Sequence, residues 1–149
     1  MQEAGYDTYY TGKLFNSHST DNYNYPYVAG FNGSDFLLDP FTYDYLNATF
    51  QRNHDPPQSF EGQHTTAVIR QKALGFLDDA LAGDRPFFVT VAPVAPHAHW
   101  DWRHVLSSDP IPMIEPIPEK QHENLFPDAK VPRSESFNPD KVRWSLSVE

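Results

Sequence analysis

The sequence predicts an α/β fold, in which a helix and the strands around it alternate along the chain and long loops join them. Residues 86–92 read Pro-Phe-Phe-Val-Thr-Val-Ala, an apolar run rich in β-branched and aromatic side chains that predicts a buried strand. Residues 62–83, directly before it, carry apolar side chains at helical spacing. Residues 8–11 give a second, shorter strand signal near the start of the chain.

The segments before the helix alternate between strand and loop character. Gly5 is suited to cap the end of a helical turn, after which residues 8–11 begin the first strand. Residues 16–40 are rich in Asn, Asp, Ser, Gly and Tyr, which predicts a long loop with local turns. Residues 42–51 alternate in part and predict an edge or hairpin strand, which ends at His54-Asp55-Pro56-Pro57.

One apolar stripe marks the helix predicted over residues 62–83. Its members are Val68, Ile69, Ala73, Phe76, Leu77, Ala80 and Leu81. Gly83 stands where glycine follows helix ends, and the strand begins three residues later. A parallel sheet needs a further strand before this helix to complete a crossover. Without neighbouring strands to cover them, the helix and residues 87–91 would expose apolar faces.

Prolines dominate the remainder of the chain. They recur so often after His97 that no long element fits, and we expect residues 98–149 to wrap a surface. The chain therefore divides into a strand with a lysine motif (1–15), loops and edge strands (16–61), a helix–strand unit with a histidine motif (62–97) and the proline-rich segment (98–149).

Composition excludes several classes of function. A net charge of −9 argues against nucleic acid or an anionic membrane as partner. No run is long enough to span a membrane, and the first residues, Met1-Gln2-Glu3, lack the features of a signal peptide. The sequence has no cysteine, hence no disulfide, thiolate metal ligand or thiol nucleophile. Asn32 and Asn47 each begin an Asn-x-Ser/Thr triplet and are candidate glycosylation sites, which favours a secretory parent protein.

Two polar residues follow predicted strands directly. Pro93 and Pro96 cannot sit inside a ladder, so the strand stops near Ala92 and carries His97 just past its carboxyl end. Ligands bind at that edge in open α/β sheets. Lys13 likewise follows a strand and a glycine, an arrangement that aims an ammonium group into the mouth of a cleft.

Both of these positions lie in recognisable motifs. Residues 5–13, Gly-Tyr-Asp-Thr-Tyr-Tyr-Thr-Gly-Lys, resemble the second signature of the sulfatase family, Gly-Tyr-x-Thr-x-x-x-Gly-Lys. Residues 86–97 resemble that family's Pro-Phe-Phe…Ala-Pro-x-x-Pro-His segment, in the family's order. The amino-acid sequence is most similar to fungal arylsulfatases and glucosamine-6-sulfatases, over most of the chain up to about Trp144. The resemblance implies part of an alkaline-phosphatase-like sheet, hydrolysis of aryl or sugar sulfate esters, and a secreted, vacuolar or lysosomal-like location.

The resemblance also implies roles for individual residues. Lys13 would contact the sulfate group and the hydrated aldehyde of the family's nucleophile. His97 would bind the sulfate and protonate or orient the leaving oxygen, for which its neutral-range pKa is suited. Many sulfatases have a histidine two residues after the lysine, where this chain has Phe15 followed by Asn16. Asn16 and His99 are counted as further candidate substrate-binding residues.

The family's cofactors are not provided for by this sequence. Sulfatases act through a formylglycine made from Cys or Ser in Cys/Ser-x-Pro-x-Arg, beside a calcium ion held by Asp and Asn residues. The nearest approach, Ser108-Asp109-Pro110-Ile111-Pro112, lacks the arginine, and the segments that supply the metal ligands are not recognisable. We therefore expect an internal part of a sulfatase catalytic domain, with the sulfate-side lysine and histidine but without turnover of its own.

Two alternatives remain open at this stage. Residues 97–104 approach the His-x-His-x-Asp-His run of zinc hydrolases, although Trp102 stands where the final histidine is required. A non-catalytic sugar-binding surface is the other, built from aromatic residues that would otherwise anchor loops. The aromatic residues in question are Tyr9, Tyr10, Tyr23, Tyr25, Tyr27, Trp100 and Trp102.

Overall fold

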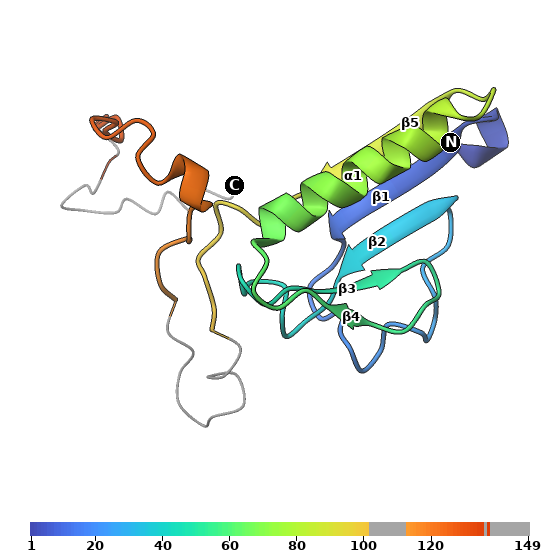
Figure 1. Ribbon diagram of the computed structural model, residues 1–149, viewed down its shortest axis with the longest axis horizontal. Helices are drawn as coiled ribbons and strands as arrows, with labels where there is room; N and C mark the ends of the chain where they lie inside the picture. The colour runs from blue at the N-terminus through green and yellow to red at the C-terminus, as the bar shows by residue number, and fades with distance from the viewer. Residues whose placement is uncertain (102–112, 136, 138–149) are drawn as a thin grey trace, which may run out of the picture.

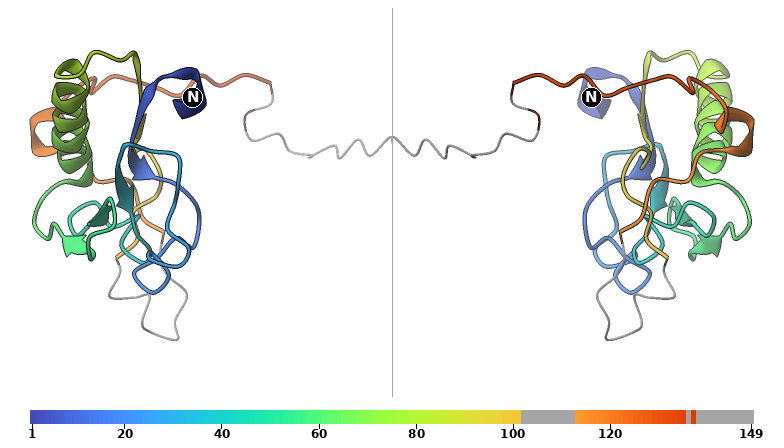
Figure 2. Two further views of the ribbon diagram at one scale, coloured as in Figure 1. Left: turned by 90° about the vertical axis from the view of Figure 1, so that its right-hand side faces the viewer. Right: turned by 90° about the vertical axis from the view of Figure 1, so that its left-hand side faces the viewer.

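The computed structural model describes residues 1–101, 113–135 and 137. Five strands form one sheet in the order β4-β3-β2-β1-β5, and a helix, α1, covers one of its faces (Figures 1 and 2). The predicted α/β fold is confirmed. The elements are η1 (Gln2–Ala4), β1 (Asp7–Lys13), β2 (Gly33–Leu37), β3 (Thr49–Arg52), β4 (Gln58–Ser59), α1 (Thr65–Leu81), β5 (Phe87–Ala92) and η2 (Lys120–His122).

Parallel pairing at the centre of the sheet brings three strand ends together. β1 pairs in parallel with β2 on one side and with β5 on the other, with Gly12 opposite Ala92 and Lys13 opposite Leu37. β3 and β4 continue the sheet by antiparallel pairing. The carboxyl ends of β1, β2 and β5 therefore meet at one edge, and Lys13 lies at the same edge as the segment that follows β5.

The loop prediction for residues 16–40 is wrong at Gly33–Leu37, which form β2. All five residues of this strand are buried, including the polar Ser34 and Asp35. Asp35 is fully buried because Lys72 Nζ and Arg52 Nη1 approach its two carboxylate oxygens at 2.6 and 3.0 Å. These partners are distant in sequence, so local composition suggested a loop. The strand predicted over residues 42–51 is confirmed only from Thr49, because turns occupy most of residues 42–48.

Helix α1 contributes to two separate hydrophobic clusters. Its buried residues Val68 and Ile69 pack with Leu37 and Phe50 of the central strands. One turn from its other end, Phe76 and Ala80 pack on Tyr9, with the half-buried Val89 of β5 beside them. Most of the predicted stripe is therefore buried or half-buried, but Leu81 is 66% exposed.

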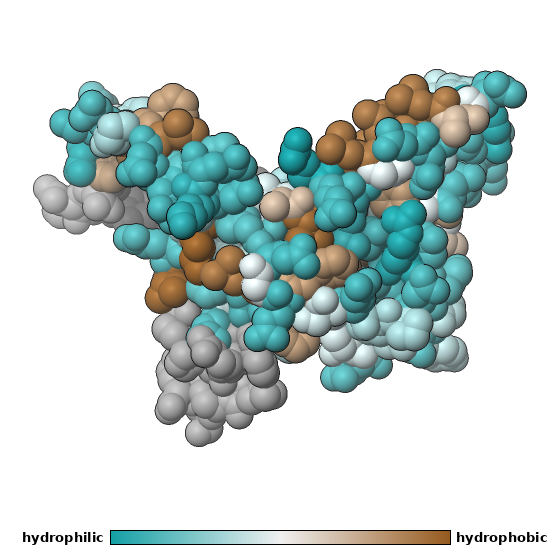
Figure 3. Space-filling view, in the orientation of Figure 1, coloured by the Kyte–Doolittle hydropathy of each residue, from teal (hydrophilic) through white to brown (hydrophobic). Residues whose placement is uncertain are grey.

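Strand β5 is not the buried strand that its composition predicts. Among the described residues it pairs only with β1 and so forms an edge of the sheet. Phe87, Phe88 and Val91 are 38%, 47% and 47% exposed. The cause is that no further strand from the described residues lies beside β5. Hydrophobic surface is also visible over the adjoining end of α1 (Figure 3). The expected exposure of apolar faces is thus confirmed.

The chain leaves the sheet after β5, which ends at Ala92 (Figure 1). Ile114 returns to pair with His99 through two backbone hydrogen bonds, and the carbonyl oxygen of Ile117 lies 2.9 Å from His64 Nε2. The incomplete nucleophile-like motif at residues 108–112 lies outside the described residues. Among the described residues, no helix is long and apolar enough to cross a membrane.

Candidate functional site

Lys13 occupies the last position of β1, at the edge where the parallel strands end. The preceding Gly12 has φ +110°, a conformation that side-chain-bearing residues rarely adopt. Its α-carbon lies so close to β5 that an added Cβ would stand 2.0 Å from the carbonyl oxygen of Ala92. Glycine is therefore required for β1 and β5 to approach each other immediately before the lysine, which explains the Gly-Lys pair in physical terms.

Tyr43 connects the lysine to the histidine. Lys13 Nζ donates hydrogen bonds of 2.5 Å to the hydroxyl oxygen of Tyr43 and to Oδ1 of Asn16. Tyr43 also stacks on His97, with the ring centroids 4.1 Å apart and an angle of 28° between the ring planes. Tyr43 is itself buried in the main core, so the residue that joins the two side chains is rigidly held.

His97 is held by its backbone and leaves its ring exposed. Its N–H donates to the carbonyl oxygen of Val94 at 2.9 Å, and its carbonyl oxygen accepts a 2.8 Å hydrogen bond from the hydroxyl of Tyr45. The ring nitrogen Nδ1 lies 2.9 Å from the carbonyl oxygen of Ala98. Because a carbonyl can only accept, Nδ1 carries a proton and Nε2 is the nitrogen available to a ligand.

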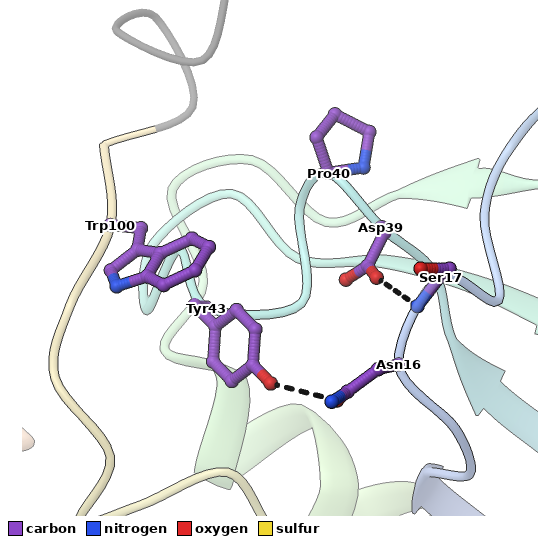
Figure 4. A pocket seen from close by; sticks show the side chains of 6 residues that line it. All are labelled: Asn16, Ser17, Asp39, Pro40, Tyr43 and Trp100. Carbon is purple, nitrogen blue, oxygen red and sulfur yellow. Dashed lines mark hydrogen bonds between the residues drawn. The ribbon is translucent and has the colours of Figure 1, made fainter. Parts of the chain in front are cut away.

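A cavity of about 350 Å³ opens beside this cluster. Figure 4 shows its six lining residues: Asn16, Ser17, Asp39, Pro40, Tyr43 and Trp100. The Trp100 ring packs 4.8 Å from the Tyr43 ring, and Asp39 Oδ2 accepts a 2.8 Å hydrogen bond from the backbone of Ser17. The cavity thus offers an apolar wall of rings opposite a short polar wall, next to the ammonium of Lys13.

A buried histidine lies behind the polar wall. His18 is 8% exposed, packs edge-on against Phe36 at 5.6 Å, and neither ring nitrogen has a hydrogen-bond partner in the described part of the chain. Burial lowers the pKa of His18, and the negative charge of Asp39 opposes that effect only in part. His18 is therefore held neutral, next to the loop that carries Asn16 and Ser17.

The other sequence-predicted residues lie apart from Lys13. His99 is buried and lines a second cavity with Asn47, and this cavity shares no lining residue with the cavity beside Tyr43. Asn47 is 9% exposed, and its Oδ1 accepts a hydrogen bond from Ser59 at 3.3 Å. Asn32 is exposed at the opposite end of β1, where its Oδ1 accepts from the backbone of Thr8 at 2.8 Å.

The geometry bears on both alternatives raised by the sequence. His99 lines the second cavity and His97 does not, and the described residues contain no group of three histidine or carboxylate side chains that could hold a metal ion. The residues that the structure describes therefore do not fit the family's calcium ion either. Of the aromatic residues, Tyr9 packs against Phe76 and Tyr10 against Phe36, as loop and strand anchors do. Trp102 lies outside the described residues.

Comparisons with known proteins identify the family. The model of the family described as Sulfatase matches residues 1–122 of the chain. The chain belongs to the sulfatase family. It is 37% identical over 154 aligned positions to an arylsulfatase from Volvox carteri, and 33% identical over 138 to an arylsulfatase from Chlamydomonas reinhardtii. Those alignments cover 97% and 89% of this chain.

The chain spans about a fifth to a quarter of the curated sulfatases that it matches, namely 23% and 20% of the two algal proteins. Sulfatase ppz1 from Metarhizium majus (strain ARSEF 297) is 39% identical over 102 residues, 68% of this chain and 22% of that protein. The structure of BT4656 in complex with its substrate D-glucosamine-2-N,6-O-disulfate superposes with a TM-score of 0.52 at 24% identity. It covers 74% of this chain and 22% of that one, and confirms the sulfatase-type, alkaline-phosphatase-like fold.

Sequence reasoning missed Tyr43, the residue that joins Lys13 to His97. Tyr43 lies in residues 42–51, whose partial alternation suggested a strand rather than a site. Only the closeness of Tyr43 to two residues at strand ends reveals its place, and no local pattern carries that information.

Proposed function

We propose that this chain forms the sulfate-binding and leaving-group side of a sulfate-ester hydrolase site. The observation that carries the proposal is that Lys13 and His97, from two neighbouring strand ends, both contact Tyr43. In a whole sulfatase the reaction would be hydrolysis of an aryl or sugar sulfate.

Lys13 supplies the positive charge for the sulfate group. Its ammonium has three donors, and two of them are engaged by Asn16 and Tyr43. The remaining donor binds a nonbridging sulfate oxygen, while the two neutral acceptors fix where the ammonium stands. A preorganised cation of this kind stabilises the negative charge that shifts among the sulfate oxygens as the S–O bond breaks.

His97 serves the ester oxygen. With Nδ1 bonded to the carbonyl of Ala98, protonation of Nε2 produces an imidazolium whose Nε2–H points away from the backbone. As the bond between sulfur and the ester oxygen breaks, that proton passes to the leaving oxygen and yields a neutral alcohol or phenol. Stacking on Tyr43 holds the imidazole plane during the transfer.

The cavity beside Tyr43 receives the ring that carries the sulfate. Trp100 and Pro40 present apolar surface to a flat aryl ring or to the C–H face of a sugar, and Asp39 accepts hydrogen bonds from hydroxyl groups. The algal relatives are named arylsulfatases, whereas BT4656 is described with a sulfated glucosamine. Both ester classes are consistent with this lining, and the proposal covers both.

The chain by itself is proposed to have no turnover. Sulfur must be attacked by a nucleophile, and the sequence contains neither cysteine nor a complete formylglycine motif. The described residues also offer no group able to hold the family's calcium ion, so no step is assigned to either cofactor. A secreted, vacuolar or lysosomal-like location is part of the same proposal and is supported by the arylsulfatase relatives. Glycosylation at Asn32 and Asn47 is also proposed and rests on the two sequence triplets alone.

Titration with inorganic sulfate tests the binding half of the proposal. In the isotope-labelled chain, sulfate should shift the NMR signals of Lys13 and the ring of His97 together. Lys13→Ala should weaken binding about tenfold, the expected effect of losing one charge-assisted hydrogen bond. Lys130→Ala, which removes an exposed lysine from the distant 113–135 segment, is the matched control and should change nothing. Equal binding by the two variants would contradict the proposal.

An activity assay tests the other half. The purified chain with calcium and a chromogenic aryl sulfate should release no product above the level of a Lys13→Ala, His97→Ala double variant. Turnover above that level would refute the proposal that this chain lacks its own nucleophile.

A further inference from the structure

A second cavity, of about 430 Å³, adjoins the two segments that carry Tyr43 and Trp100. The backbone N–H of Trp100 donates to the carbonyl oxygen of Tyr43 at 3.0 Å and joins the two segments. Their neighbours in sequence, Asp44 and His99, line the second cavity. The two cavities therefore share one wall, with the aromatic residues facing the first and the polar residues facing the second.

The protonation of His99 can be assigned from its hydrogen bond. The backbone N–H of Tyr45 donates to His99 Nδ1 at 3.3 Å, so Nδ1 holds a lone pair rather than a proton. The neutral ring then carries its proton on Nε2. His99 is only 7% exposed, and within the described residues Nε2 has no hydrogen-bond partner. His99 thus lines this cavity with an N–H donor that no described residue accepts.

The remaining polar groups of the second cavity are mainly acceptors. Asp44 is buried and uses Oδ1 to accept from the backbone of Leu46 at 3.0 Å, which leaves Oδ2 for a ligand. Glu61 and Asp101 add carboxylates. A sulfate group would be repelled by three carboxylates. A metal ion is also a poor occupant, because no group of three possible ligands comes together in the described parts of the chain.

Hydroxyl groups fit these features, since each can accept from Nε2–H and donate to a carboxylate. Leu46 and Ile117 also line the cavity and give apolar contact for the C–H face of a ring. We propose that the second cavity binds an unsulfated sugar, with a hydroxyl group bound between His99 Nε2 and the carboxylate of Asp44. The proposal rests on the proposed function in one respect: the sugar would belong to a partly sulfated glycan whose sulfated residue occupies the first cavity.

The test is an NMR titration of the chain with glucose, glucosamine and N-acetylglucosamine. The chain is taken without glycans, because Asn47 lines the same cavity and heads a glycosylation triplet. At least one of the sugars should shift the His99 ring signals saturably, with a dissociation constant in the millimolar range, and should leave the His97 ring unchanged. The separate titration with inorganic sulfate reports on Lys13 and His97. Failure of sugar binding and failure of the proposed function therefore give different results.

Two variants make the result specific to His99. His99→Asn keeps an acceptor for the N–H of Tyr45 but removes the Nε2 donor, and should weaken sugar binding about fivefold. Asp44→Asn should weaken it by a similar factor, whereas His122→Phe, in the exposed η2 turn, should have no effect. Unchanged sugar binding in His99→Asn, no binding by the native chain, or shifts produced by calcium and not by sugars would each overturn the proposal.

Discussion

Replacing Gly12 by alanine should separate the two strands on which the site depends. The new Cβ would lie 2.0 Å from the carbonyl oxygen and 2.6 Å from the carbonyl carbon of Ala92. Because real Cβ contacts essentially never fall below 3.0 Å, the strands must part by about 1 Å (3.0 − 2.0) at this point. At this point the carboxyl ends of β1 and β5 lie side by side, and Lys13 and His97 follow at the same edge of the sheet.

The cost has two sources that can be estimated separately. Alanine at φ +110° is strained by about 1–3 kcal/mol. Overpacking between strands adds about 1–3 kcal/mol. The sum of about 2–6 kcal/mol is a large part of the roughly 5–15 kcal/mol that stabilises a typical domain.

Gly75→Ala is the matched control for this substitution. Gly75 lies inside α1, and a Cβ there meets no atom within 4 Å. Alanine should therefore stabilise the helix by about 0.5–1 kcal/mol. The same change, glycine to alanine, thus has opposite predicted signs at the two positions.

Urea unfolding followed by circular dichroism measures both effects. Gly12→Ala should lower the midpoint strongly, and Gly75→Ala should raise it slightly. At low urea, the ring-current shift of His97 should also weaken in Gly12→Ala if the stack on Tyr43 loosens. A Gly12→Ala variant as stable as the native chain would refute the close approach of β1 and β5 at the site.

Three further predictions concern Tyr43, Asp35 and His18. Tyr43→Phe keeps the stack on His97 but removes a hydrogen-bond acceptor of Lys13. Sulfate should therefore bind about threefold to tenfold more weakly in an NMR titration, while the chemical shifts of the His97 ring are retained. An unchanged affinity for sulfate would argue against positioning of Lys13 by Tyr43. Asp35→Ala should lower the free energy of unfolding in urea by about 3–5 kcal/mol, because Lys72 loses its carboxylate partner. Asp79→Ala, at an exposed position, should lower it by about 0.5 kcal/mol or less. Similar losses in the two variants would contradict this reasoning. Burial lowers the pKa of His18 in the folded state, so the unfolded chain binds the proton more readily and stability should fall as pH decreases below about 6.5. In His18→Phe that part of the pH dependence should be absent from unfolding curves, and a dependence equal to that of the native chain would count against it.

Local signals in the sequence were enough for the elements that position the site. The apolar run 87–92 and the spacing of Val68, Ile69, Phe76 and Ala80 are properties of short segments, and both elements form as predicted. The prolines after Ala92 and the glycine before Lys13 also act locally. These signals placed Lys13 and His97 at strand ends, and parallel pairing of β1 with β5 then put the ends at one edge.

What could not be predicted depends on residues far apart in sequence. β2 is a strand although it contains Asp35, because Lys72 arrives from α1 and Arg52 from β3 to neutralise the carboxylate. The composition of β5 predicted a buried strand, but it does not reveal that β5 lies at the edge of the sheet that the described residues form. Tyr43 joins the site from a turn region between β2 and β3, and His99 lines a cavity whose lining does not include His97.

A crystal structure of the chain grown or soaked in sulfate would test the shared anion pocket most directly. A sulfate ion should lie within about 3.2 Å of both Lys13 Nζ and His97 Nε2, with Tyr43 still bonded to the lysine. A sulfate bound to only one of the two side chains, or Lys13 and His97 turned away from each other around it, would contradict the account.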